Sequence, residues 1–305
     1  MAGGKRLQDA LSIMILLYMF GACIAFQIII TQLFKYVCSK FGMSPELTCD
    51  TCYKLSVYQA VPTAVLILLP LSLKKDMSAF RYVSLASIGA LLYTGILLLV
   101  ELPSYYEHFS QTADIRPAYW DWNVFPGCSI TFFAYTCQVQ LLPIYGELQR
   151  PSYQRLSKVI NRSILTDFLF YFTIAIAGYL SNFQDTQPIV LKRNLLPGVD
   201  HDYGLLVAIL AVCACVLVAF PVNYHPFREE FTKTILRRKA PNQDLSNKEN
   251  LLVTSVFVAL TCFISIIFPK ISKVISIMSG LIAVSMCFLI PVICIVRLAP
   301  RGEEG

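Results

Sequence analysis

Residues 126–150, PGCSITFFAYTCQVQLLPIYGELQR, decide the fold, because they are long enough to cross a bilayer yet unsuited to one uninterrupted helix. Gln138 and Gln140 lie at the middle of this stretch, and Pro143 interrupts its second half. Proline removes a backbone hydrogen-bond donor, and a glutamine inside a membrane is costly unless it has a partner. An interrupted span of this kind is typical of a transporter, in which the freed backbone groups face a substrate. The alternative is an ordinary kinked span whose glutamines bond to neighbouring helices.

The composition is that of a membrane protein. Of the 305 residues, 56% are hydrophobic and 14% are charged, whereas soluble domains contain about 25% charged residues. A helix that spans a bilayer needs about 20 mostly apolar residues. Eight stretches meet this requirement: 8–34, 56–73, 79–102, 125–146, 160–182, 203–224, 250–268 and 273–296. We therefore predict an all-α polytopic membrane protein with a single transmembrane domain. The span at 56–73 is the weakest, because it is short and contains Pro62 and Pro70.

Basic residues are distributed unevenly between the two sides of the membrane. Eight spans place both termini on one side, and 17 of the 25 lysines and arginines lie on that side, against 8 on the other. Positive residues favour the cytosolic side, so we predict that both termini are cytosolic. The net charge of +6 follows from this topology, and we predict no binding of nucleic acid. The plasma membrane and a vacuolar or lysosomal membrane are both open.

Most of the eleven cysteines lie inside predicted spans, where cysteine behaves as a small apolar residue. Cys38, Cys49 and Cys52 lie in the first outer loop, and an oxidising compartment would allow a disulfide from Cys38 to Cys49 or to Cys52. A lone CxxC without two further ligands predicts no metal site. The sequence has no nucleophile–base pair, glycine-rich phosphate loop or HExxH stretch, so we predict neither an enzyme nor a cofactor.

Two titratable residues are candidates for coupling transport to an ion. Asp167 lies shortly inside the span at 160–182, and an acidic residue in a span is a functional hypothesis by default. The alternative is that Arg162 or Lys158 pairs with it at the interface. His225 follows the span at 203–224 and can titrate near neutral pH. A histidine at a membrane edge is, however, more often a solvated or capping residue.

Several stretches resemble one family in sequence. Residues 132–148, FFAYTCQVQLLPIYGEL, resemble the sixth helix of the amino acid/auxin permease family, which includes the sodium-coupled neutral amino acid transporters. Residues 20–32 resemble its third helix. Further matches follow in the same order, with 178–180 similar to the seventh helix, 221–228 to the end of the eighth, 268–269 to the ninth and 279–291 to the tenth. The family usually has a histidine beside the sixth-helix cysteine. This chain has Gln138 there, so a pH dependence associated with that histidine does not carry over.

The resemblance implies a fold of two inverted repeats of five helices. Substrate binds where the first and sixth helices break, and the amino ends of half-helices face the substrate carboxylate. On this map, residues 1–124 hold three helices of an incomplete first repeat, 125–296 hold the second repeat, and 297–305 form a cytosolic tail. Helices one, two and eleven have no counterpart among the spans. The sequence is therefore expected to be either a fragment or a shortened relative.

The resemblance also implies a secondary active amino acid transporter that works by alternating access, coupled to H⁺ or Na⁺. The residues expected near the substrate lie on the sixth, third and tenth helices: Thr131, Phe132, Tyr135, Thr136, Gly21, Gln27 and Ser279. For Gly21 and Gln27, helix packing and an interhelical hydrogen bond are the alternative. The alternative for the whole protein is a truncated, non-transporting relative that acts as a membrane sensor or assembly partner.

Overall fold

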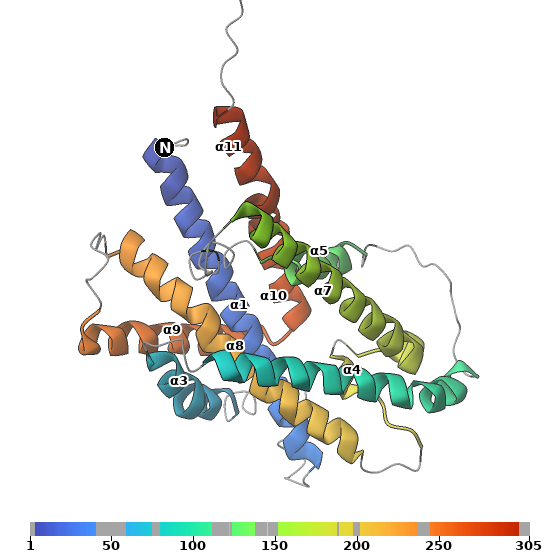
Figure 1. Ribbon diagram of the computed structural model, residues 1–305. Coiled ribbons are helices and arrows are strands. Elements are labelled where there is room, and N and C mark those ends of the chain that lie inside the picture. The colour runs from blue at the N-terminus through green and yellow to red at the C-terminus, as the bar shows by residue number, and fades with distance from the viewer. Residues whose placement is uncertain are drawn as a thin grey trace, which may run out of the picture.

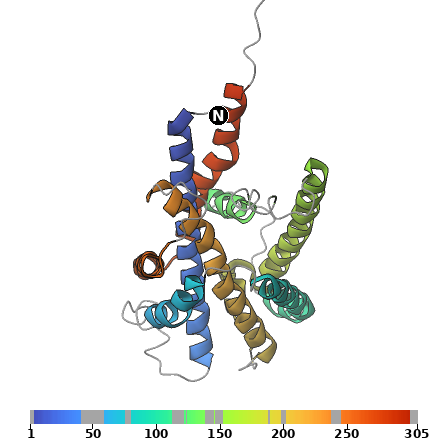
Figure 2. The same ribbon diagram turned by 60° about the vertical axis from the view of Figure 1, so that its left-hand side comes forward.

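The computed structural model describes residues 4–40, 59–74, 80–111, 122, 124–137, 145, 152–187, 189–197, 202–236 and 245–298. Within these ranges the chain is helical, with short turns and connections and no β-strand. The helices cross one another at varied angles and do not form a parallel bundle (Figures 1 and 2). The prediction of an all-α polytopic protein is confirmed.

The helices are bounded as follows: α1 (Gly4–Lys40), η2 (Thr63–Leu68), α3 (Leu69–Leu73), α4 (Phe80–Ser110), α5 (Val124–Ala134), α7 (Tyr153–Asn182), η3 (Phe183–Asp185), η4 (Val190–Lys192), α8 (Tyr203–Thr234), α9 (Asn247–Ile267), α10 (Ile271–Ile277), η5 (Met278–Ala283), η6 (Ser285–Leu289) and α11 (Ile290–Leu298). Three of these segments, η2, η5 and η6, are π-helical. From α10 to α11 the chain is one helical rod with two π-helical stretches inside it.

Six helices of the described chain are long and apolar enough to cross a membrane: Gln8–Cys38, Leu85–Ser110, Tyr153–Asn182, Tyr203–Thr234, Asn247–Ile267 and Ile271–Ile293. Two shorter apolar helices, Gln59–Leu73 and Val124–Ala134, stand at the second and fourth predicted spans. Those are the spans in which prolines and polar residues argued against a continuous helix. All eight predicted spans are therefore helical in whole or in part.

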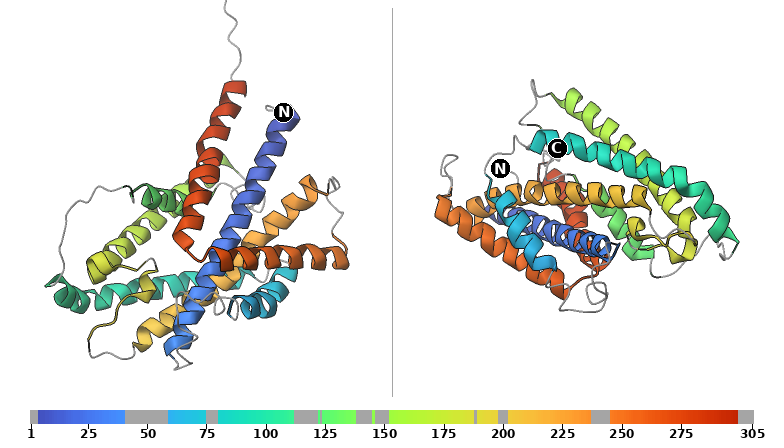
Figure 3. Two further views of the ribbon diagram at one scale, coloured as in Figure 1. Left: turned by 180° about the vertical axis from the view of Figure 1, so that it is seen from behind. Right: turned by 90° about the horizontal axis from the view of Figure 1, so that it is seen from below.

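The central helix is α1, which packs against α8, α9, α10 and η5 (Figure 3, right). Small residues at its middle, including Ala22, Cys23 and Ala25, are buried and allow close approach of its neighbours. The largest core cluster joins α1 to α8, α9 and the Gln59–Leu73 helix, and its rings include Phe220, Tyr224 and Phe257. The first turns of α1 and the helix α11 lie at the same end of the molecule (Figures 1 and 3).

Two helices continue past the predicted ends of their membrane spans. Helix α4 runs through Pro103 to Ser110, and α8 runs through Pro221 and Pro226 to Thr234, beyond the predicted span ends at 102 and 224. A proline removes only one backbone bond, and polar side chains can satisfy the carbonyls near it. In α8, Pro221 and Pro226 remove the backbone donors of the Leu217 and Val222 carbonyls, and the Asn223 side-chain amide donates to the nearby Ala219 carbonyl at 2.9 Å.

A buried arginine joins α4 to the start of α8. Arg193, in the connection between α7 and α8, is 3% exposed and forms an ion pair with Glu101 of α4. Its guanidinium lies 3.9 Å from Asp202 Oδ2 and 3.9 Å from the centre of the Tyr105 ring. Burial lowers the pKa of Arg193 from its usual value, and Asp202 opposes that shift. Asp202 also caps α8, because its Oδ1 accepts from the Leu205 N–H at 2.9 Å.

A second buried arginine, near the carboxyl end of α8, joins α8 to the start of α9. Arg228 Nη1 donates to Asn250 Oδ1 at 3.1 Å, and Asn250 Nδ2 donates to the Leu73 carbonyl at 3.3 Å. The Tyr224 hydroxyl and Thr254 Oγ1 are 2.9 Å apart in the same interface. These hydrogen bonds connect α8, α9 and α3. Because they lie in the low-dielectric interior, breaking them is costly in free energy.

Candidate functional site

The fourth predicted span is broken after a short helix. Helix α5 ends at Ala134, and the described residues 135–137 are not helical. The last carbonyl groups of a helix have no partner within it and carry partial negative charge. The predicted interruption is therefore confirmed, although it starts before the residues that suggested it. Gln138, Gln140 and Pro143 lie outside the described residues.

Side chains from two other helices contact the backbone carbonyls of α5 and its end. The Tyr18 hydroxyl of α1 donates to the Thr136 carbonyl at 3.3 Å, and the Ser279 hydroxyl of η5 donates to the Ser129 carbonyl. The Tyr18 and Phe133 rings lie 5.5 Å apart. The break thus lies where α1, α5 and η5 meet, and Thr136 and Ser279 are the two predicted site residues found at these contacts.

Gly21 lies at the same junction, where it permits close packing. A side-chain carbon built at this position would overlap the Met278 side chain of η5. With glycine here, the Met278 side chain packs directly against α1, and any larger residue would force Met278 to shift. The structure therefore places Gly21 beside η5, in contact with Met278.

The other predicted residues of α5 point to different neighbours. The Phe132 ring is 50% exposed and packs edge-on against Phe288 of η6, with centroids 6.4 Å apart. The Tyr135 ring packs edge-on against Tyr171 of α7, with centroids 5.5 Å apart. Thr131 is exposed and its hydroxyl donates to the Gly127 carbonyl at 3.1 Å. At the end of α5, Phe132 therefore faces η6 and Tyr135 faces α7, while Thr131 is exposed.

Gln27 lies on a different face of α1. It is fully buried, and its Nε2 donates to the Ala60 carbonyl at 3.2 Å, while its Oε1 accepts no hydrogen bond from the described residues. This bond is interhelical, because Ala60 belongs to the Gln59–Leu73 helix. The structure thus separates Gln27 from the junction of α1, α5 and η5.

Replacing Gln27 by leucine is expected to change the free energy of unfolding by less than about 1 kcal/mol. The lost bond leaves the Ala60 carbonyl satisfied, since the Thr63 hydroxyl also donates to it at 2.9 Å, and the substitution removes a buried oxygen that has no partner. Thermal unfolding of the purified variant measures this. A fall of several degrees in the unfolding midpoint would show that the Gln27–Ala60 hydrogen bond contributes more to stability than expected.

The two titratable candidates do not contact the break in the described part of the chain. Asp167 is exposed on α7 and forms no ion pair with the residues the structure describes. His225 Nε2 lies 2.9 Å from Arg228 Nη2, and its Nδ1 lies 3.6 Å from Glu229 Oε1. Arginine only donates, so Nε2 accepts and a neutral His225 carries its proton on Nδ1, facing the carboxylate.

Of the three cysteines in the predicted disulfide, only Cys38 is among the described residues. Cys38 is buried near the end of α1 and its thiol is free, whereas Cys49 and Cys52 are not among the described residues. Within the described ranges, no group of three His, Cys, Asp or Glu side chains is placed to hold a metal ion.

Tyr18, Ser129 and Met278 are not among the predicted site residues. Tyr18 precedes Gly21 by one helical turn and so shares its face, which is the signal that could have identified it. Ser129 contributes its backbone carbonyl, and the Met278 side chain fills the space beside Gly21. Other residue types could play either role, so no sequence motif would identify them.

Comparison with known proteins identifies the family. Residues 2–301 match the family described as "Transmembrane amino acid transporter protein". The chain is 27% identical over 302 residues to the sodium-coupled neutral amino acid transporter 7 of Xenopus laevis, which covers 94% of this chain and 63% of that protein. It is 26% identical over 300 residues to the same transporter of Danio rerio and 26% identical over 299 residues to that of Homo sapiens, each covering 96% of this chain and 63% of the relative.

The chain therefore spans less than two thirds of the length of these curated relatives. No solved structure matches it. The resemblance to the amino acid/auxin permeases is confirmed, because the match runs along almost the entire chain. The chain belongs to the transmembrane amino acid transporter protein family.

Proposed function

We propose that this protein transports amino acids across a membrane by alternating access, with its substrate site at the break after α5. The observation that carries the proposal is that α5 ends inside a predicted span, where Ser279 contacts a carbonyl of the helix and Tyr18 contacts a carbonyl just past its end. Membership of a transporter family supports the same conclusion. Interrupted helices at a junction of several spans are the usual binding sites of secondary transporters.

The polarity of the break suits a cation. The carbonyls of Thr131, Phe132 and Phe133 already accept hydrogen bonds from Tyr135 and Thr136, but the dipole of α5 still gives its carboxyl end partial negative charge, which favours an ammonium group or a metal cation. We propose that the α-ammonium group of the amino acid or a coupling Na⁺ contacts this end. Na⁺ is proposed over H⁺ because the relatives are named sodium-coupled neutral amino acid transporters. Neutral amino acids are accordingly the proposed substrates.

The side chains around the end of α5 have distinct proposed roles. Thr136, whose hydroxyl donates to the Phe132 carbonyl at 2.7 Å, would hold the break in shape. Phe132 and Tyr135 would enclose the apolar part of the substrate, and Thr131 would line the approach to it. Gly21 and Ser279 would keep α1 and η5 close to α5.

Replacing Thr136 by valine is expected to lower the initial rate of neutral amino acid uptake by roughly 3- to 10-fold, the effect of one lost hydrogen bond. The measurement is uptake of a labelled neutral amino acid into proteoliposomes under an inward Na⁺ gradient. Thr166→Val is the matched control, because the Thr166 hydroxyl also donates to the carbonyl four residues earlier but is exposed on α7.

Normal uptake by Thr136→Val at normal protein levels would remove Thr136 from the site. Replacement of Na⁺ by choline is expected to abolish uptake, and unchanged uptake would point to H⁺ as the coupling ion. Failure of the unmodified protein to accumulate any neutral amino acid under either gradient would favour a non-transporting sensor or assembly partner.

A further inference from the structure

The buried arginine near the carboxyl end of α8 is held by two neutral acceptors. Arg228 is 8% exposed. Its Nη1 donates to Asn250 Oδ1 at 3.1 Å, and its Nη2 donates to His225 Nε2 at 2.9 Å. Neither of these acceptors is a carboxylate. A buried charged donor depends on its hydrogen-bond partners, so the loss of either acceptor is costly.

The bond from Arg228 to His225 exists only while His225 is neutral. A neutral imidazole accepts through Nε2, whereas a protonated imidazole donates from both nitrogens. Protonation therefore removes the acceptor of Arg228 Nη2 and brings two positive groups within hydrogen-bond distance of each other. The His225 side chain is 18% exposed, so it is accessible to protons from water. Histidine is the side chain that changes its charge between pH 5 and 8.

An attraction between protonated His225 and Glu229 opposes this effect only weakly. Glu229 Oε1 lies 3.6 Å from His225 Nδ1. The Glu229 side chain is, however, 57% exposed, and its Oε2 already lies 3.7 Å from Lys233 Nζ. Solvent screens an exposed pair of this kind, and such pairs contribute little to stability. The lost bond to the buried arginine therefore outweighs the gain at Glu229.

Other charged groups lie on the elements that pack together at this end. Those that the structure describes are Asp9 of α1, Lys74 after α3, Glu230 of α8, and Lys248 and Glu249 of α9. The Glu230 carboxylate accepts from Thr234, and Glu249 caps the start of α9. None of these residues is changed in the variants compared below, so their own titration contributes equally to all of them.

The Arg228 side chain belongs to a junction of three helices. Asn250, its second acceptor, donates to the Leu73 carbonyl of α3, and α3 packs against both α8 and α9 (Figure 1). The guanidinium is planar, so its two bonds together fix its orientation. When Nη2 loses its acceptor, the bond from Nη1 to Asn250 weakens with it.

We propose that His225 makes the junction of α8, α9 and α3 sensitive to pH. Neutral His225 holds Arg228 against Asn250, and protonated His225 releases it. The contribution of this junction to stability is therefore fully present while His225 is neutral, and it is lost as the pH falls and His225 takes up a proton. The first turns of α9 should then separate more readily from α8 and α3.

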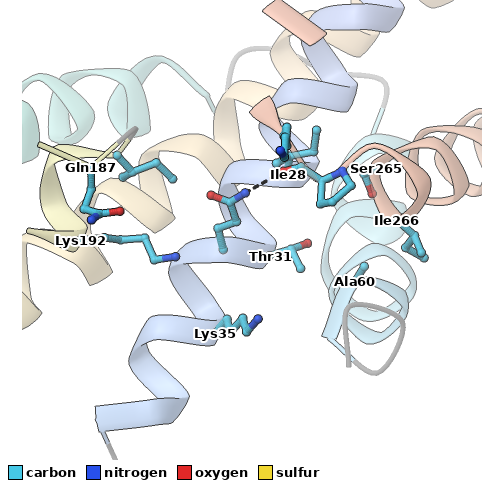
Figure 4. Close-up of a pocket in the computed structure, with 12 residues that line it drawn as sticks. Ile28, Thr31, Lys35, Ala60, Gln187, Lys192, Ser265 and Ile266 are labelled. Atoms are coloured by element: carbon cyan, nitrogen blue, oxygen red, sulfur yellow. Dashed lines mark hydrogen bonds between the residues drawn. The ribbon is translucent and has the colours of Figure 1, made fainter. Parts of the chain in front are cut away.

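The junction is distant from the cavity at the other end of α9. That cavity, of about 270 Å³, is lined by Ser265 and Ile266 of α9 and by Thr31 and Lys35 of α1 (Figure 4). From Asn250 to Ser265 the rise along a helix is about 22 Å. A buffer ion or lipid that enters the cavity therefore does not touch His225 or Arg228.

The test compares the unmodified protein with His225→Gln at pH 7.5 and 5.5. Glutamine offers an uncharged oxygen that can accept from Arg228 at both pH values. His108→Gln is the matched control, because His108 is an exposed histidine of α4. Unfolding in detergent micelles is followed by circular dichroism, and amide hydrogen exchange of residues 247–254 reports on the first turns of α9.

The unfolding midpoint of the unmodified protein is expected to fall by about 4 °C more than that of His225→Gln between pH 7.5 and 5.5. At pH 5.5 its residues 247–254 should exchange about 5-fold faster than those of His225→Gln, and at pH 7.5 equally fast. His108→Gln should behave as the unmodified protein. Equal pH dependence of the unmodified protein and His225→Gln, or an equal effect of His108→Gln, overturns the proposal.

An Arg228→Leu background tests whether the effect passes through the arginine. There, His225→Gln is expected to make no difference to the pH dependence, and a difference of the original size overturns the proposal. If either variant does not fold, the unmodified protein decides. Exchange of residues 247–254 relative to the intrinsic rate must then rise at pH 5.5 while that of α4 stays constant, and no rise overturns the proposal. No readout involves transport, so the outcome is independent of the proposed function.

Discussion

Replacing Arg193 by methionine is expected to lower the free energy of unfolding by about 3–5 kcal/mol, the cost of removing one partner from a buried ion pair. The guanidinium is almost fully buried, forms an ion pair with Glu101 and lies 3.9 Å from Asp202 Oδ2. Methionine fills similar volume and leaves both carboxylates without their cation. Because the cluster joins α4 to the start of α8, its loss should loosen that end of the molecule first.

The measurement is the unfolding of purified protein in mixed detergent micelles, with Arg162→Met, an exposed arginine of α7, as the control. Adding Glu101→Gln and Asp202→Asn to Arg193→Met should recover part of the loss, since it neutralises the stranded charges. Asparagine also remains a good helix cap at position 202. Equal stability of Arg193→Met and Arg162→Met would show that the cluster contributes little.

Replacing Gly21 by valine is expected to cost about 1–3 kcal/mol of stability and to abolish amino acid uptake. A side chain at this position overlaps Met278, so α1 and η5 must separate where both approach α5. Adding Met278→Ala should restore stability and most of the uptake, because it returns the space that valine takes. Gly89→Val is the control, since a side chain at Gly89 of α4 meets no atom within 4 Å.

Unfolding and uptake are measured on the same preparations. Uptake that stays lost in the double variant while stability recovers would mean that Gly21 itself, and not the spacing, is required. Retained uptake in Gly21→Val would show that α1 and η5 need not be in contact for transport.

The sequence located the helices well, because hydrophobicity is a local property that each segment carries by itself. Within the described residues, the second and fourth spans, which contain prolines and polar residues, are the ones that form short apolar helices. Helix ends were predicted less well. Pro103, Pro221 and Pro226 lie inside helices, since a single lost backbone bond can be offset by side chains and by packing.

The candidate site could be predicted only in part. Thr136 and Ser279 were marked by polarity and by resemblance, and the structure places both at contacts of α5. Tyr18 could not be assigned a partner, because it contacts a backbone carbonyl 118 residues away. Arg193 and Glu101 are likewise far apart in the chain, and one sequence contains no information about which charged residues meet.

The ties made by Arg228 and Asn250 have a mechanical consequence. They join α8, α9 and α3 at one end, and α1 packs against α8 and α9 along its length, so these helices should move as one rigid frame. The Ser279 hydroxyl links η5 to α5 through one hydrogen bond, so α5 should move together with the start of the rod from α10 to α11. The π-helical stretches η5 and η6 are wider and less regular than α-helical turns, so we expect the rod to bend there. In the proposed alternating access, α5 and the rod would then move against the frame, with the proposed substrate site between them.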